Sequence, residues 1–93
     1  MIVGLLRVEL LIHNSRSLKA KRHVLKGLKE RLRRGFNISV AEIDNHDKWQ
    51  RATLGIAYLD RNKALVNSAL DKILNFIETF HEVQLTDQEM EIL

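Results

Sequence analysis

The amino-acid sequence predicts an α+β sandwich, in which a four-stranded antiparallel sheet carries two helices on one face. Three observations predict this class. Aliphatic residues recur at helical spacing in two segments, around 18–34 and 61–81. Segments rich in aliphatic and β-branched residues lie before, between and after them. No Gly/Ser-rich linker or change of composition interrupts the 93 residues, so residues 1–93 are expected to form a single domain.

The first half of the chain predicts a strand followed by a helix. Residues 2–12 (IVGLLRVELLI) are apolar on much of both faces, which is typical of a central strand. A turn follows at 13–17, where the hydroxyl of Ser15 or Ser17 can accept a hydrogen bond from a first-turn amide. The helix is expected to end at Gly35 in a left-handed conformation. Its apolar positions are Leu18, Val24, Leu25, Leu28 and Leu32.

The second half predicts a hairpin, a helix and a terminal strand. Residues 36–43 and 49–59 alternate as strands, and the polar residues 44–48 connect them. Asp60 is expected to cap a second helix that runs to about His81, and a weaker edge strand begins near Val83 and Leu85. The order βαββαβ with right-handed crossovers predicts the ferredoxin-like arrangement.

Composition narrows the classes of protein that the chain can belong to. The absence of cysteine excludes disulfides, thiolate metal sites and a cysteine nucleophile, and it fits a reducing cytosol. Arg7 and Glu9 interrupt the apolar start, so no stretch approaches the roughly 18 to 20 residues that span a bilayer. No export signal is recognisable. We therefore expect a cytoplasmic protein with no membrane association.

Groups that could carry catalysis or bind a metal are few. Asp44, His46 and Asp47 offer metal ligands within four residues, but a polar hairpin turn explains them more simply. Serine, histidine and aspartate all occur without a G-x-S-x-G elbow or another sign of an activated nucleophile. We expect no enzyme activity, no catalytic residues, no metal and no cofactor.

The net charge of +3 conceals a strongly uneven distribution. Residues 16–34 carry nine Lys or Arg against one acid, a net charge of +8, whereas residues 60–93 have a net charge of −4. On a helical wheel, five of the cations form a basic stripe along one flank over roughly 21 Å. It consists of Lys19, Arg22, Lys26, Lys29 and Arg33. The stripe either binds a polyanion or is a solvated face paired with acids such as Asp71 and Glu78.

The predicted sheet face opposite the helices lacks aromatic residues at its middle positions. Those positions are Leu5, Arg7, Glu9, Thr53, Gly55 and Ala57, so a platform for stacking RNA bases is excluded. Trp49 beside Arg51 can stack on a base at the rim of this face. The alternative is that Trp49 closes the end of the core or an oligomer interface.

Two further sites follow from the pattern. Lys21 falls on the apolar side of the first helix and is expected to extend its ammonium outward. Alternatively, Lys21, Arg22 and the backbone amides of Ser15 to Ser17 form an anion site at the helix start. The exposed sheet face also carries an apolar patch, which predicts a homo-oligomer, most simply a dimer. Its interface residues are Val3, Leu5, Ala57 and Leu59, together with Gly55.

Three motifs occur in order: Ser17–Arg22 (SLKAKR), Phe36–Glu42 (FNISVAE) and Trp49–Ala52 (WQRA). Over nearly the whole chain, the sequence resembles the YlxP-like family, small bacterial proteins classed as a domain of unknown function. The resemblance implies a ferredoxin-like fold and no established activity. The motif residues carried over are Ser17, Lys19, Lys21, Arg22, Glu42, Asp44, Trp49, Gln50 and Arg51. His13 stands where the family often has a proline.

Genes of the family often lie among those of transcription and translation factors, near a ribosome-binding factor, which implies an association with RNA or the ribosome. Together with the basic helix, this predicts a non-catalytic RNA- or ribosome-associated binding module. Two alternatives stay open. One is a homo-oligomeric interaction protein that buries the exposed sheet face, and the other is a phosphate- or small-ligand-binding domain.

Overall fold

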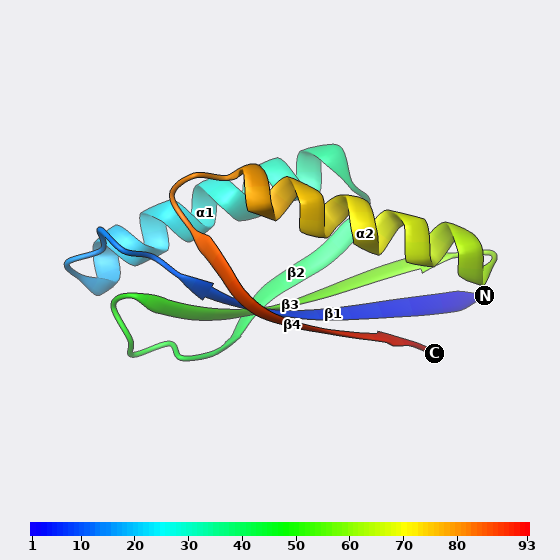
Figure 1. Cartoon of the computed structure of the whole chain (residues 1–93), viewed down its shortest axis with the longest axis horizontal. Helices are drawn as coiled ribbons and strands as arrows, with labels where there is room; N and C mark the ends of the chain where they lie inside the picture. The colour runs from blue at the N-terminus through cyan, green and yellow to red at the C-terminus, as the bar shows by residue number, and fades with distance from the viewer.

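The computed structural model describes residues 1–93, and its elements follow the predicted order βαββαβ. They are β1 (Ile2–Leu11), α1 (Leu18–Gly35), β2 (Ile38–Asp44), β3 (Arg51–Asp60), α2 (Lys63–Thr79) and β4 (Gln84–Ile92). The strands form one antiparallel sheet in the order β2-β3-β1-β4. Both helices lie on the same face of this sheet (Figure 1). The predicted α+β class and ferredoxin-like arrangement are confirmed.

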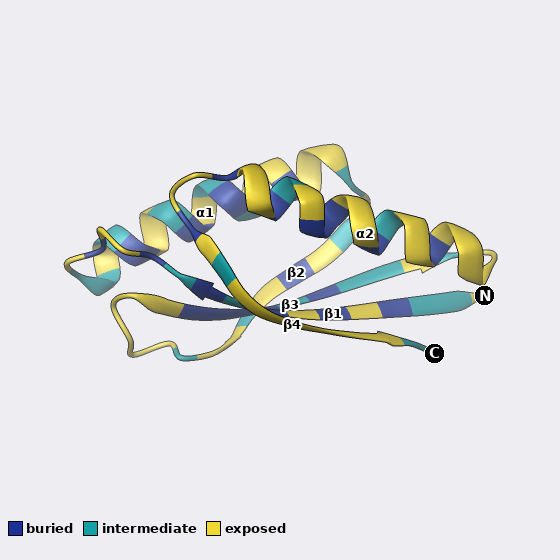
Figure 2. Cartoon of the chain, viewed as in Figure 1, coloured by how far each residue is buried: buried dark blue, intermediate teal, exposed yellow.

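The core lies between the sheet and the two helices. Alternate residues of the central strands point into it, and Leu6, Val8, Leu54 and Ile56 are at most 2% exposed. The buried residues of both helices face the sheet, whereas their outer faces are exposed (Figure 2). These helix residues are Leu25, Leu28 and Leu32 of α1 and Val66, Leu70, Ile73, Leu74 and Ile77 of α2. The opposite sheet face, which we call the open face, carries no covering layer.

Helix α1 begins as predicted but ends differently. Ser17 is its N-cap, and its hydroxyl accepts a hydrogen bond from the amide of Ala20 at 3.0 Å. No glycine has a positive φ, so the prediction of a left-handed Gly35 is wrong. Phe36 instead adopts an extended conformation and donates its amide to the carbonyl of Leu32 at 2.9 Å. That bond satisfies a carbonyl of the last turn without a left-handed residue.

The cap of helix α2 is also displaced from its predicted position. Asn62 is the N-cap and accepts a hydrogen bond from the amide of Leu65 at 2.9 Å. Asp60 is the last residue of β3, and its carboxylate accepts hydrogen bonds from the hydroxyl of Tyr58 and the amide of Arg61, both at 2.7 Å. The hydrogen bond from Tyr58 is the main cause that lowers the pKa of the Asp60 carboxyl, and the hydrogen bond from the amide of Arg61 lowers it further. The same bond to Asp60 raises the pKa of the Tyr58 hydroxyl.

Strands β2 and β4 form the two edges of the sheet. Strand β4 is a full nine-residue strand paired with β1, although its sequence predicts only a weak strand. The β2–β3 connection runs from 45 to 50, later than predicted, and Asn45 within it has a φ of 61°. A register shift between Glu42 and Asp44 precedes this connection. The connection lies at the end of the sheet nearest the start of α1, since the carbonyl oxygens of Asn45 and His46 accept hydrogen bonds from Lys21 of that helix.

Candidate functional site

The basic stripe lies on the side of α1 that adjoins the β2 edge of the sheet. Lys19, Arg22, Lys26 and Arg33 are exposed, and Lys29 is half-buried. The guanidinium of Arg33 donates to the carbonyl oxygen of Val40 in β2 at 3.1 Å, which fixes the orientation of this flank. The helix therefore presents its row of cations along one edge of the molecule.

None of the stripe cations forms an ion pair. The three ion pairs of the chain are Arg7–Glu9 at 3.3 Å, Arg7–Glu89 at 4.0 Å and Lys21–Glu42 at 3.0 Å. The acids of α2 that were considered as partners, Asp71 and Glu78, contribute to none of them. The positive charge of the stripe is therefore presented to solvent rather than neutralised within the fold.

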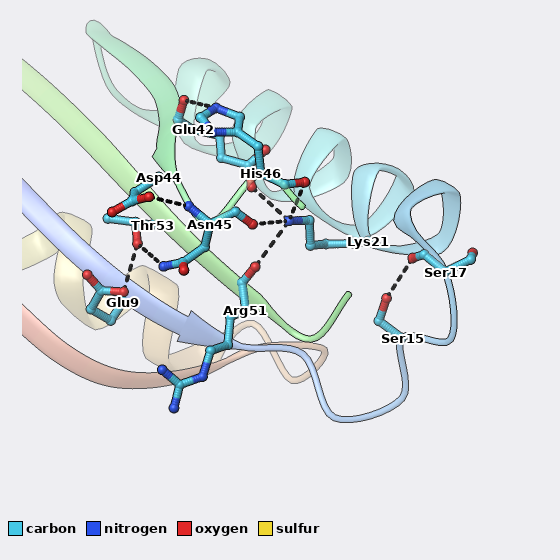
Figure 3. A network of polar contacts seen from close by, with 10 residues as sticks. All are labelled: Glu9, Ser15, Ser17, Lys21, Glu42, Asp44, Asn45, His46, Arg51 and Thr53. Atoms are coloured by element: carbon cyan, nitrogen blue, oxygen red, sulfur yellow. Dashed lines mark hydrogen bonds and ion pairs between the residues drawn. The ribbon is translucent and has the colours of Figure 1, made fainter. Parts of the chain in front are cut away.

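Lys21 belongs to the same helix but points into the molecule, and its side chain is 1% exposed. Its ammonium faces four oxygen atoms, as Figure 3 shows. These are Oε2 of Glu42 at 3.0 Å and the carbonyl oxygens of Asn45 at 2.9 Å, Arg51 at 3.1 Å and His46 at 3.4 Å. The prediction that this ammonium extends outward is wrong, because its charge and hydrogen-bonding capacity are met inside.

The predicted anion site at the start of α1 is not assembled. The Lys21 ammonium is turned away from solvent, and the backbone amide of Ser15 donates to the carbonyl of Ile12 at 3.2 Å. The hydroxyl of Ser15 donates to the carbonyl of Ser17 at 3.1 Å. Of the four predicted residues, only Arg22 directs an unpaired cation outward. The hypothesis of a phosphate- or small-ligand-binding site thereby loses its central cation.

Trp49 and Arg51 occupy different surroundings. Trp49 is 56% exposed in the 45–50 connection, so it does not close the end of the core. The side chain of Arg51 points away from Lys21 (Figure 3). Arg51 lines a hollow with Glu9 and Asp87, on the open face of the sheet. The structure therefore separates Arg51 from the basic stripe.

The open face holds a shallow groove of about 530 Å³, whose lining residues include Leu5, Ile43, Gly55 and Ala57. Of the predicted interface residues, Leu5 is 38% exposed, Leu59 is 55% exposed, and Val3 and Ala57 are half-buried. No aromatic side chain lines the groove, as the sequence predicts.

A polar network closes one end of the open face. Thr53 points to this face but is buried, because its hydroxyl donates to Glu9 at 2.7 Å and accepts from the side-chain amide of Asn45 at 2.9 Å (Figure 3). The β2–β3 connection, which supplies Asn45, therefore covers that end of the sheet. A periodicity argument places Thr53 correctly on the open face but misses its burial.

The polar residues of the hairpin make contacts typical of a turn. The carboxylate of Asp44 accepts from the amide of Asn45 at 2.7 Å, and the ring of His46 contacts the carbonyl of Glu42 at 3.0 Å. Asp47 is exposed. Neither helix is long and apolar enough to cross a membrane.

Comparison with known proteins identifies the family. The sequence matches, over residues 3–90, the family described as "Protein of unknown function (DUF503)". The chain belongs to this family. It is 36% identical over 85 residues to the uncharacterized protein YlxP of Bacillus subtilis (strain 168), a match that covers 91% of this chain and 92% of the relative. The resemblance to the YlxP-like family is therefore confirmed.

Two solved structures resemble this DUF503 chain to different extents. The de novo designed protein Foldit4 matches with a TM-score of 0.56 and 14% identity, over 100% of this chain and 97% of the design. A dimeric ferredoxin-like protein from an uncultured marine organism matches with a TM-score of 0.48 and 15% identity, over 100% and 96% of the two chains. At 14% identity the likeness to Foldit4 concerns the fold alone.

We call Lys21 and the four oxygen atoms around its ammonium the Lys21 site. This site joins the three motifs on which the resemblance to the family was based. SLKAKR supplies Lys21, FNISVAE supplies Glu42, and WQRA supplies the carbonyl of Arg51. The side-chain amide of Gln50 adds hydrogen bonds to the carbonyls of Ser15 at 3.2 Å and His13 at 3.4 Å. These motif residues thus hold the 45–50 connection against the start of α1. In the sequence, the only indication of the Lys21 site was the position of a lysine on the apolar side of a helix.

Proposed function

We propose that this DUF503 protein is a non-catalytic binding module for RNA, free or in a ribosomal particle, and that the basic stripe of α1 contacts its phosphates. The observation that carries this proposal is the row of five cations, four of them exposed, with no carboxylate partner. The row extends over roughly 21 Å at 1.5 Å per residue, which is long enough to meet several phosphates. A rigid helix holds the row, so little backbone conformational entropy is lost on binding.

The contacts that the structure offers favour the RNA backbone over the bases. A stacking platform would need aromatic side chains on the open face, and its groove has none. Trp49 is the exposed aromatic residue, and the Lys21 site holds its loop against the start of α1. Trp49 therefore adds a stacking contact at one end of the stripe, whereas Arg51 takes no part.

The test compares two variants of equal net charge. One removes three stripe cations, Lys19→Ala/Arg22→Ala/Lys26→Ala, and leaves Arg33 in place because it bonds to Val40. The matched control removes three cations near and within α2, Arg61→Ala/Lys63→Ala/Lys72→Ala. All six residues are exposed, and none of them forms an ion pair. Each variant lowers the formal net charge from +3 by three units.

Binding is measured by the fluorescence anisotropy of a labelled RNA of about 20 nucleotides between about 50 and 200 mM KCl. The stripe variant should bind at least about tenfold more weakly, and its slope of log K against log[salt] should be shallower by about 2, because about 0.7 to 0.9 is lost per phosphate contact. The control should stay close to the wild type. Equal losses in both variants, or no salt-dependent binding by the wild type, would overturn the proposal.

A further inference from the structure

The open face is uneven from one edge of the sheet to the other. On the β2–β3 side Ser39, Ala41 and Ala57 are small and leave the groove, and the side chain of Ile43 lies over Gly55. On the β1–β4 side longer side chains form a ridge. The pairing register places Arg7 between Gly55 and Glu89, and Leu5 opposite Ala57. The face therefore carries a ridge of Leu5, Arg7 and Glu89 beside a hollow over Ser39, Ala41 and Ala57, which Ile43 borders.

The charges of the molecule are also divided between the two edges. Asp87, Glu89 and Glu91 of β4 lie opposite Glu9, Arg7 and Leu5, so these acids share the open face with them. At the other edge, Arg33 bonds to Val40 of β2 and brings the flank of the basic stripe beside this strand. The β4 edge therefore carries three acids, whereas Arg33 and the adjoining flank of α1 bring positive charge beside the β2 edge, whose own strand carries Glu42 and Asp44.

We propose that the open face binds a second copy of this chain about a two-fold axis that runs parallel to the strands, between the two sheets. Such an axis places the β4 edge of one copy over the β2 edge of the other. The ridge of each copy then enters the hollow of its partner, and the acids of each approach the basic edge of the other. A two-fold axis perpendicular to the strands would instead place β4 over β4 and oppose like charges.

The size of the face is sufficient for such a dimer. Four strands at about 4.8 Å spacing and about ten residues of about 3.3 Å give a flat footprint of roughly 600 Å². The relief of ridge and hollow increases the accessible area toward the roughly 800 Å² per partner of a standard interface. Leu5 and Leu59, which are 38% and 55% exposed, would be covered. We therefore expect a reversible dimer rather than an obligate one.

Sedimentation equilibrium between about 1 µM and 1 mM protein tests this proposal. The average mass of the wild type should rise from that of one chain toward that of two, and it should rise less in high salt. Leu5→Glu should weaken the dimer at least about tenfold, because it places a charge on the ridge that the partner covers. Leu65→Glu is the matched control, since Leu65 is 37% exposed but lies on α2.

A second variant tests the direction of the axis. Neutralising the acidic edge with Glu89→Gln/Glu91→Gln should weaken the dimer several-fold, because it removes attraction to the basic edge of the partner. A stronger dimer in this variant would mean that acid faces acid, and it would overturn the proposed axis. A wild type that stays monomeric throughout, or a Leu65→Glu variant that dissociates as readily as Leu5→Glu, would overturn the interface itself.

Discussion

At the scale of single residues, Lys21 makes the largest set of polar contacts of any side chain in the molecule. Its ammonium is withdrawn from water and meets one carboxylate and three carbonyl oxygens at 2.9 to 3.4 Å. The Glu42 side chain is itself only 15% exposed. Removal of one partner of such a pair leaves the other charge without compensation in a poorly solvated position. The site therefore links the stability of the fold to the placement of the 45–50 connection.

We predict that Lys21→Met lowers the free energy of unfolding by about 3 kcal/mol, because Glu42 and the carbonyl oxygens lose their donor. Lys26→Met is the control, since Lys26 is exposed and forms no ion pair. It should change stability by less than about 0.5 kcal/mol. Urea unfolding of both variants measures the difference, and equal stabilities would contradict the role assigned to Lys21.

The helical wheel shows which side of α1 Lys21 occupies, but not what it meets there. Its partners lie 21 to 30 positions further along the chain, and three of them are backbone oxygens that no side-chain pattern reveals. Thr53 is a parallel case, because its burial depends on a loop residue, Asn45. Sequence periodicity assigns a face, whereas contacts between loops decide what covers it.

At the scale of elements, helix α2 packs closely on strand β1 at Gly4. A Cβ atom at this position would lie 2.5 Å from Cγ1 of Val66 and 2.9 Å from Cδ1 of Leu70. A Cβ at Gly35, at the end of α1, would meet no atom within 4 Å. The first glycine is thus required by packing between elements, and the second is not.

We predict that Gly4→Ala destabilises the protein by about 1 to 3 kcal/mol, because α2 must shift or its side chains must leave their preferred rotamers. The control Gly35→Ala should stabilise the protein by about 0.5 to 1 kcal/mol, since alanine costs less backbone entropy in a helix. Thermal unfolding monitored by circular dichroism compares them. A Gly4→Ala variant as stable as the wild type would contradict the close packing of α2 on β1.

The order and type of the elements follow from their periodicity, but their ends and edges depend on contacts that periodicity does not show. Strand β4 is weakly predicted because six of its nine residues are polar, and pairing with β1 makes it a strand. Asp60 and Asn62 are both good capping residues by type. The strand pairing of Asp60 with Ile2 leaves the cap to Asn62.

At the scale of the whole molecule, the strand order converts an uneven distribution of charge along the sequence into a surface with acidic and basic regions on opposite sides. Counting along the chain finds the excess of cations in residues 16–34 and of acids in residues 60–93. The strand order β2-β3-β1-β4 is needed to see that β4 and β2, the strand beside α1, lie at opposite edges of the sheet. The proposed RNA contact and the proposed dimer both depend on this separation of charge.

The contact surface for RNA can be mapped directly by nuclear magnetic resonance. Labelled wild-type protein is titrated at low salt with an RNA of about 20 nucleotides, and the amide shifts are followed residue by residue. The account predicts that the largest shifts fall on residues 19–33, with further shifts at 45–50, while residues 84–92 stay unchanged. Shifts centred on β4, or no shifts at equimolar RNA, would contradict it.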